Sequence, residues 1–380
     1  MSLPTNFFIG RGLKKSPVLG YSVGQGSSNG TNGIMLFDPA TMERLALFHT
    51  GSAQGAQNVV MDELAVYHNY GYNNNDISRY LKSNLNPTAS GYVNSATFNA
   101  GDQSRSNIAV DATKIYNGRN DGRVRFQNKL NGSGSLDKYI GNSSEMYALA
   151  VDNTYAYVGG SANNGDMKIY QRSNFNNYSQ ISASNYSTIS SIVTDDSAIY
   201  FTGYGSGLNG LSVYKAAKSN HGSLSFNSYI PPGGSGSSYT NAVVVDDSYV
   251  YTSGYSTNYV GKFNKSTLLG NSGCVISSTS IPRFGTSNIS LTVEHGKGLI
   301  SDTDSLYLAA DTDQGPYVIK IDKATMSPVA CLQHPSISNF NFWSGGRHIT
   351  LDNQEGGGMF WYRNAISNWN VNENASNILV

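Results

Sequence analysis

Aspartates that recur along the chain, each followed by a tyrosine five positions later, form its most regular chemical pattern. The first copy is NVVMDELAVY, with Asp62 and Tyr67, and another contains Asp246 and Tyr251. The other aspartates of these Asp boxes are Asp111, Asp152, Asp195, Asp302 and, in a degenerate copy, Asp352. A catalytic acid and base must converge on one substrate. Single carboxylates between apolar runs are instead expected to accept backbone N–H groups in tight turns. The tyrosines should pack between repeats, with hydroxyls reaching solvent or a backbone group.

Two further motifs could bind a phosphate or a metal. The segment GYGSGLNG at 203–210 matches GxGxxG, but it lies between two predicted strands, where no helix N-terminus can bind a phosphate. Asp311 and Asp313 resemble the start of a calcium loop, yet the downstream bidentate acid of such a loop is absent. We therefore predict no cofactor and no metal, with a weak calcium site at Asp311 and Asp313 as the alternative.

The histidines and cysteines show no catalytic or metal-binding arrangement. None of the six histidines belongs to an HxxxH pair or lies at metal-ligand spacing from a carboxylate. No GxSxG nucleophile elbow, with its serine between a strand and a helix, is predicted. Cys274 and Cys331 occupy comparable positions late in successive repeats, so we expect free thiols on outer strands, too far apart for a disulfide. These residue types predict that the protein is not an enzyme.

The composition restricts the classes of partner. The 380 residues include 25 Lys plus Arg and 25 Asp plus Glu, and the resulting net charge of zero argues against nucleic acid as a ligand. Charged residues are only 13%, while 41 Gly and 26 Tyr are present, so amides and hydroxyls are expected to hydrate the surface. No sufficiently long apolar run occurs, and we expect no membrane span.

The Asp boxes belong to a longer repeat of short strands. Around Asp246 an apolar strand, the box turn, a second strand and a Gly/Ser/Asn loop lead to a third strand. Third strands alternate with the boxes and are predicted at 34–37, 77–81, 123–126, 167–170, 211–214, 259–263 and 317–321. The boxes recur about every 48 residues, a spacing typical of four-stranded propeller blades. Helical periodicity is not sustained anywhere, so the fold is predicted to be all-β.

The order of the repeats indicates how the chain closes. The series begins with a third strand near Ile34 and ends with the box at Asp352, so the first and last segments together complete one blade. We therefore predict a single seven-bladed β-propeller over residues 18–380, closed by pairing of N- and C-terminal strands, with residues 1–17 as an anchoring segment. An eighth blade would have to lie within 266–299, an interval too short for it.

The loops between second and third strands are expected to meet on one face around the channel mouth. They are rich in Gly, Asn, Tyr and Ser, which suits a hydroxyl-rich ligand or a protein partner. The candidate binding residues are Tyr72, Asn74, Asn117, Asn164, Tyr204, Tyr255 and Asn258. The alternative is that Gly and Asn only provide turn conformations with positive φ.

Two resemblances extend this interpretation. The strand–Asp–strand repeats, with FDPAT at 37–41 and KIDKAT at 320–325, resemble quinoprotein-like and NHL-like propellers over residues 18–362. This resemblance implies the fold and no enzymatic residues, because no cofactor-contact pattern of those enzymes is present. The opening LPTNFFIGRG and the charge-poor, Gly/Ser/Asn/Tyr-rich composition resemble structural proteins of tailed-phage virions, particularly neck, tail or fibre-associated ones.

The second resemblance implies a non-catalytic structural component of a phage particle, located in the virion after assembly in the host cytoplasm. Its expected partners are other virion proteins or a host surface carbohydrate, bound through one propeller face, and neither nucleic acid nor a membrane. The alternative is a propeller enzyme, a lyase, hydrolase or quinone-dependent oxidoreductase, with its site at the channel mouth. The lack of a charged or metal-ligand cluster in the sequence favours the first.

Overall fold

Strands make up the regular structure of this protein. The computed structural model describes residues 18–22, 33–49, 56–62, 65–70, 76–81, 96–99, 108–119, 121–139, 146–161, 165–206, 208–283, 285–333 and 349–351. Every regular element within these ranges is a β-strand, which confirms the all-β prediction. Accordingly, the described part of the chain contains no helix able to cross a membrane.

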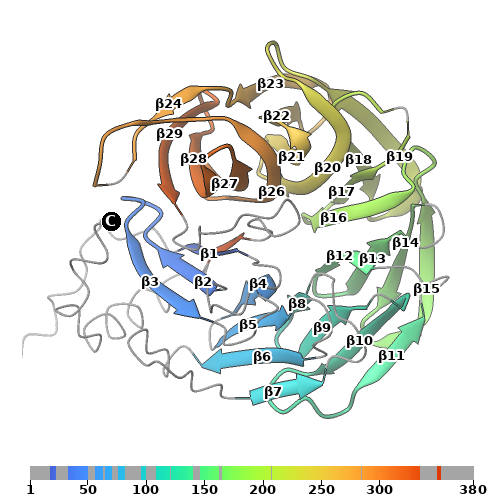
Figure 1. The fold of residues 1–380 in the computed structure, drawn as a ribbon. Coiled ribbons are helices and arrows are strands. Elements are labelled where there is room, and N and C mark those ends of the chain that lie inside the picture. The colour runs from blue at the N-terminus through green and yellow to red at the C-terminus, as the bar shows by residue number, and fades with distance from the viewer. Residues whose placement is uncertain are drawn as a thin grey trace, which may run out of the picture.

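The strands form antiparallel groups of four (Figure 1). The first group combines the start and the end of the chain in the order β3 (Arg44–His49), β2 (Gly33–Phe37), β1 (Val18–Ser22) and β30 (Ile349–Leu351). The second contains β4 (Ala56–Met61), β5 (Ala65–Tyr70), β6 (Asp76–Leu81) and β7 (Ala96–Asn99). The third contains β8 (Ile108–Val110), β9 (Lys114–Gly118), β10 (Arg123–Asn128) and β11 (Leu136–Tyr139). The fourth contains β12 (Met146–Val151), β13 (Tyr155–Gly160), β14 (Asp166–Gln171) and β15 (Asn174–Ser182).

The remaining groups are joined into one sheet by the pairing of β17 with β20 and of β21 with β26. The fifth group contains β16 (Thr188–Thr194), β17 (Ala198–Tyr204), β18 (Leu211–Ala217) and β19 (Asn220–Tyr229). The sixth contains β20 (Gly236–Val245), β21 (Tyr249–Thr257), β22 (Tyr259–Asn264) and β23 (Gly270–Val275). The seventh contains β26 (Val293–Ser301), β27 (Ser305–Thr312), β28 (Gly315–Asp322) and β29 (Ser327–Gln333). The predicted third strands correspond to β2, β6, β10, β14, β18, β22 and β28.

The first group joins segments from opposite ends of the sequence. Strand β1 pairs antiparallel with β30, and Val18 lies opposite Leu351. This pairing is the one predicted from the two incomplete repeats. The first group also packs against the seventh group. Phe37 and Met42 of the first group share a hydrophobic cluster with Tyr307 of the seventh. Figure 1 shows the groups following one another around a common centre.

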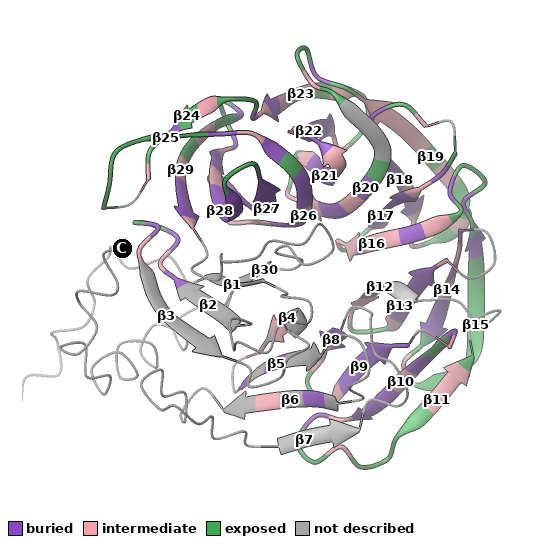
Figure 2. Ribbon diagram, in the orientation of Figure 1, coloured by how far each residue is buried: buried purple, intermediate pink, exposed green. Residues whose placement is uncertain are grey.

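Burial follows the position of a strand within its group (Figure 2). All residues of the second strand β27 are buried, whereas most residues of the outermost strand β15 are exposed. Middle strands are covered on both faces by neighbouring groups, which favours continuous apolar runs over alternation. Tyr157 of the fourth group and Phe201 of the fifth, for example, belong to one cluster. The hydrophobic core therefore lies between the groups.

A hairpin and two cysteines occupy the outer part of the sixth and seventh groups. The interval in which an eighth blade was considered contains β23 and the short pair β24 (Thr279–Ile281) and β25 (Ile289–Leu291). Arg283, in the connection between these two strands, forms a β-bridge with Cys331 on the outermost strand β29. Cys274, on β23, and Cys331 are buried free thiols, as predicted.

Candidate functional site

The carboxylate of each described Asp box is held by its own turn. Its Oδ1 atom accepts the backbone N–H of the residue three positions on, at 2.7 to 2.9 Å in all six boxes. This turn was expected from the sequence. The box tyrosine, however, donates its hydroxyl to Oδ2 of the same aspartate. The prediction that these hydroxyls reach solvent or a backbone group missed this carboxylate, which the turn brings alongside the tyrosine. The hydroxyl of Tyr307 also contacts a backbone group, the carbonyl of Pro39. Asp352 lies outside the described residues.

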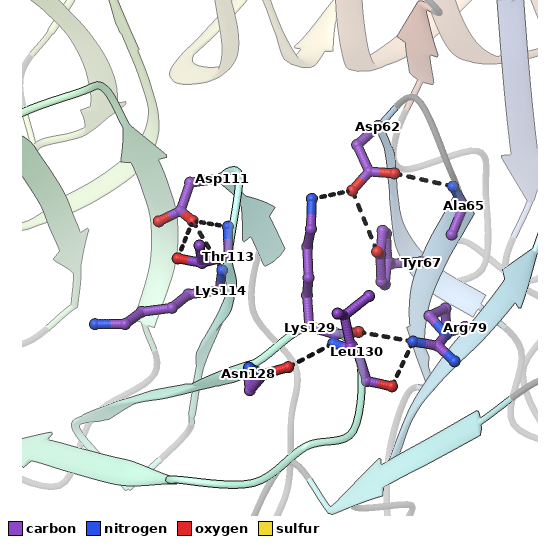
Figure 3. A network of polar contacts seen from close by, with 10 residues as sticks. All are labelled: Asp62, Ala65, Tyr67, Arg79, Asp111, Thr113, Lys114, Asn128, Lys129 and Leu130. Carbon is purple, nitrogen blue, oxygen red and sulfur yellow. Dashed lines mark hydrogen bonds and ion pairs between the residues drawn. The ribbon is translucent and has the colours of Figure 1, made fainter.

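A cation from the next group along the chain completes most of these contacts (Figure 3). Lys129, which follows the third strand β10, lies 2.7 Å from Oδ2 of Asp62 in the preceding group. Equivalent inter-sheet ion pairs, at 2.6 to 3.1 Å, are Arg172–Asp111, Lys218–Asp152, Lys265–Asp195 and Lys323–Asp246. Arg172, Lys265 and Lys323 also donate to the backbone carbonyl of the box aspartate in their own group. Each of these cations therefore links two neighbouring groups.

Asp152 shows the electrostatic consequence of these contacts. Burial alone would raise the pKa of this carboxyl, but hydrogen bonds from Lys218, Tyr157 and two backbone N–H groups outweigh it and lower the pKa to about 2. The carboxylate is thus ionised and committed to structural partners at neutral pH. A group with these properties stabilises the fold and is a poor proton donor or acceptor for a substrate.

The junction between the seventh and first groups differs from the others. In six of the seven groups a Lys or Arg directly follows the third strand, whereas Asp38 and Pro39 follow it in the first group. The box tyrosine Tyr307 donates both to Asp302, at 2.8 Å, and to the carbonyl of Pro39, at 3.1 Å. Lys320 donates to the same carbonyl at 2.6 Å. This junction therefore rests on hydrogen bonds to a backbone oxygen in place of the charge that Pro39 cannot supply.

The predicted binding residues differ in how the structure places them. Tyr72, Asn74 and Asn164 lie outside the described residues. Asn117 was expected in a loop, but it belongs to strand β9 and is fully buried, because the strand continues to Gly118. Asn258 is the single residue between β21 and β22, and its Oδ1 accepts the N–H of Ser235 at 2.9 Å. Asn117 therefore cannot contact a ligand at the surface.

Tyr204 and Tyr255 lie close together in an aromatic cluster. Tyr204 stacks on Tyr239 with ring centroids 3.7 Å apart, and Tyr239 meets Tyr255 edge-on at 5.8 Å. Tyr255 in turn stacks on the ring of His295 at 4.1 Å. These four residues come from β17, β20, β21 and β26 and so from three consecutive groups. These four residues, the aromatic cluster, lie on the side of the groups where second strands end, which we call the loop side.

Backbone pairing between the groups positions the aromatic cluster. Tyr204 lies opposite Tyr239 in the pairing of β17 with β20, and Tyr255 lies opposite His295 in that of β21 with β26. Gly254 permits this approach, since a Cβ atom there would collide with the carbonyl of Tyr239. Gly205 of the GxGxxG motif is explained similarly by the carbonyl of Asn185. Both glycines therefore allow close approach of neighbouring backbone segments.

The four rings of the aromatic cluster differ in their exposure to solvent. Tyr239 is 37% exposed, Tyr204 and Tyr255 are half-buried, and His295 is buried. His295 Nδ1 accepts the N–H of Ser256 at 2.9 Å, which places the proton of the neutral ring on Nε2. Burial, aided by the nearby charge of Lys297, lowers the pKa of His295 to about 4. His295 is therefore a neutral structural support at pH 7.

Charges beneath the cluster are paired. Lys297 Nζ lies 4.7 Å from the ring centre of Tyr255 and 3.8 Å from Oδ2 of the buried Asp311. Asp313, the second residue of the considered calcium motif, accepts the N–H of Thr292 at 2.8 Å. In the described ranges, no three His, Cys, Asp or Glu side chains are grouped so as to hold a metal ion. The aromatic cluster therefore lies next to a lysine and an aspartate whose charges offset each other.

Sequence reasoning found two members of the cluster and missed Tyr239 and His295. Tyr239 lies early in the first strand of its group, in the segment SSYTN, and His295 occupies the corresponding place in the next group. A ring at the start of a first strand was the available signal. The ring that each of them contacts, however, belongs to the preceding group. Strand pairing between groups produces no repeated pattern that could be recognised in a single sequence.

Comparisons with known proteins inform the fold alone. No protein-family model and no curated protein matches the chain. A solved structure titled "Structure of U3-55K" has a TM-score of 0.55 at 9% identity, over 74% of this chain and 82% of that one. The computationally designed Ika8 protein has a TM-score of 0.53 at 13% identity, over 88% of this chain and 94% of that one. At such identities the likeness carries no information about ligand or activity.

Proposed function

We propose that the chain is a single seven-bladed β-propeller closed by the pairing of β1 with β30. The support is that the described residues form seven groups of four strands and that the first group packs against the seventh. Closing the ring in this way would pair the first and last strands within one blade and remove an open edge between them. The 18–380 boundary follows from this proposal.

The proposed function is binding without catalysis, through the loop side, as a structural or host-recognition component of a tailed-phage particle. The single observation that carries the binding role is the aromatic cluster, which presents Tyr239 to solvent on backbone fixed by inter-group pairing. Exposed aromatic rings on a rigid support are characteristic of recognition surfaces. The described box carboxylates are all committed to turns and tyrosines, which favours a binding role over acid–base chemistry.

The placement in a phage particle rests on the opening LPTNFFIGRG and the charge-poor composition. Mass spectrometry of particles purified from cells that produce the protein tests it. A virion component is expected at a fixed copy number per particle. Absence of the chain from purified particles, with the protein present in the lysate, would exclude the placement.

A triple variant tests the binding role directly. Replacing Tyr204, Tyr239 and Tyr255 by Ala should abolish particle incorporation or adsorption to host cells while the strands remain folded. The control replaces Tyr139 and Tyr178, which are 54% and 53% exposed on the outermost strands β11 and β15. Unchanged incorporation and adsorption in the triple variant would refute binding through the aromatic cluster. Detected turnover of a substrate would favour the enzyme alternative.

A further inference from the structure

The surroundings of the aromatic cluster contain few aliphatic side chains. Large exposed hydrophobic residues in the described ranges occur mainly elsewhere. Leu136, Tyr139, Tyr178 and Val329 lie on outermost strands, and Leu130 and Leu269 follow third strands on the side of the box turns. On the loop side, only Ile230 and Tyr239 belong to this set. The core of a stable protein–protein interface is normally richer in apolar side chains than this surface is.

A hydroxyl and an amide side chain lie on segments that neighbour the cluster. Ser187 is exposed and donates its hydroxyl to the carbonyl of Tyr204 at 3.2 Å. Asn258, three residues beyond Tyr255, has its amide orientation fixed by the N–H of Ser235. Fixed hydroxyl and amide groups can exchange hydrogen bonds with ligand hydroxyls without first losing conformational freedom.

The charges near the cluster do not favour an anionic ligand. Lys297 is mostly buried and pairs with Asp311, so it contributes little net positive charge at the surface. Glu294, adjacent to His295 in the chain, is exposed. The carboxylate of Glu294 would repel a negatively charged ligand, and Lys297 is too buried to offset this repulsion at the surface. A neutral ligand is therefore the better match.

We infer that the aromatic cluster binds a neutral glycan, with the apolar face of a pyranose ring lying on Tyr239 and its hydroxyls directed to the surrounding amides and hydroxyls. This inference rests on the proposed function and specifies its ligand class. A pyranose combines an apolar C–H face with a rim of hydroxyls, which matches an exposed tyrosine ring with polar side chains on neighbouring segments, such as Ser187 and Asn258. Rigid backbone pairing under Tyr239 keeps the ordering cost of binding low.

Saturation-transfer NMR on the full chain tests the inference. The probes are the methyl glycosides of glucose, galactose, mannose and N-acetylglucosamine at millimolar concentration, with N-acetylneuraminate as the anionic comparison. At least one neutral glycoside should bind, with the strongest transfer to protons of one ring face. Tyr239→Ala should weaken this binding roughly tenfold, because a sugar face removes on the order of 60 Å² of apolar surface from water. Tyr239→Phe should retain it, and Tyr178→Ala is the control.

The possible outcomes separate the inference from the function on which it rests. Binding of a neutral glycoside that Tyr239→Ala weakens and Tyr178→Ala leaves unchanged supports the inference. Failure of all four neutral glycosides to bind, equal binding in Tyr239→Ala, or preferential binding of N-acetylneuraminate would overturn it. If no glycoside binds but the triple tyrosine variant still loses particle incorporation, the ligand is a protein and the proposed binding function stands. If that variant also behaves like the parent, both are refuted.

Discussion

Removing one inter-sheet cation should measurably destabilise the fold, and Lys218→Met is the sharpest case. Lys218 Nζ lies 2.6 Å from Oδ2 of Asp152, in the preceding group, and the two side chains are 18% and 21% exposed. Methionine retains most of the aliphatic length of lysine and removes the charge. The variant therefore removes the ion pair together with the ammonium that lies 5.9 Å from the ring centre of Tyr157, and it keeps a side chain of similar length in place.

The expected cost is about 1 to 1.5 kcal/mol of unfolding free energy at pH 7. The pKa of Asp152 falls from 3.8 to about 2, which at about 1.36 kcal/mol per unit corresponds to a net stabilisation of the carboxylate of about 2.5 kcal/mol after its partners have offset burial. Lys218 shares this carboxylate with Tyr157 and two backbone N–H groups, and solvent screens the partly exposed pair. We therefore assign the lysine about half of this net stabilisation.

The pH dependence gives the result a definite sign. Because the folded-state pKa of Asp152 is lowered, its stabilising contribution is present above the unfolded pKa of about 4 and is lost as pH falls toward 2. The difference between the parent protein and Lys218→Met should therefore be largest near neutral pH and shrink through this window. Urea denaturation monitored at several pH values measures both quantities.

A matched control separates the ion pair from the loss of any lysine. Lys138 contacts the neutral side-chain oxygen of Asn176 at 2.6 Å on the exposed outer strands, and Lys138→Met should change stability by less than about 0.5 kcal/mol. Equal stability of Lys218→Met and the parent at pH 7, or a difference that persists unchanged at low pH, would show that the inter-sheet cation does not stabilise the fold as argued.

Two further predictions concern the junction at Pro39 and the cysteines. Pro39→Lys places a cation where the other described groups carry one, beside Asp302, and should raise the unfolding free energy by about 0.5 to 1 kcal/mol relative to Pro39→Ala; equal melting temperatures of the two variants would contradict this. Burial raises the pKa of the Cys274 and Cys331 thiols to about 12, so a thiol reagent should react only slowly with the native protein. After denaturation without reductant, both thiols should react. Rapid reaction of the native protein, or no reactive thiol in the denatured protein, would contradict this prediction.

The sequence was sufficient for those features that depend on residues close together in the chain. The Asp-box turn involves the aspartate and N–H groups two and three positions on, so the residue types alone predict its hydrogen bonds, as at Asp152. The order of boxes and third strands also predicted that a strand near Val18 would pair with one near Ile349. Both inferences needed only local turn chemistry and the continuity of a repeat.

The sequence could have revealed one long-range contact that was overlooked. Lys or Arg follows the third strand in six groups, at Lys82, which lies outside the described residues, and at Lys129, Arg172, Lys218, Lys265 and Lys323. This periodic cation could have been matched with the periodic aspartate, although the partners are 61 to 67 residues apart in three of the pairs. The first group has Pro39 in place of this cation, and the significance of this difference is apparent only once the ion pairs of the other groups are known.

The candidate site depended on the tertiary structure. Asn117 looked like a loop residue because Gly118 and the polar residues after it indicate a turn, yet strand pairing continues through Asn117 and buries it. Tyr204 and Tyr255 belong to different groups, and they approach each other only because β17 pairs with β20 and the ring of Tyr239 lies between them. Short-range hydrogen bonds specify each box turn from its own residues, whereas the packing of one group against the next decides which rings meet, and that geometry is a property of the folded chain.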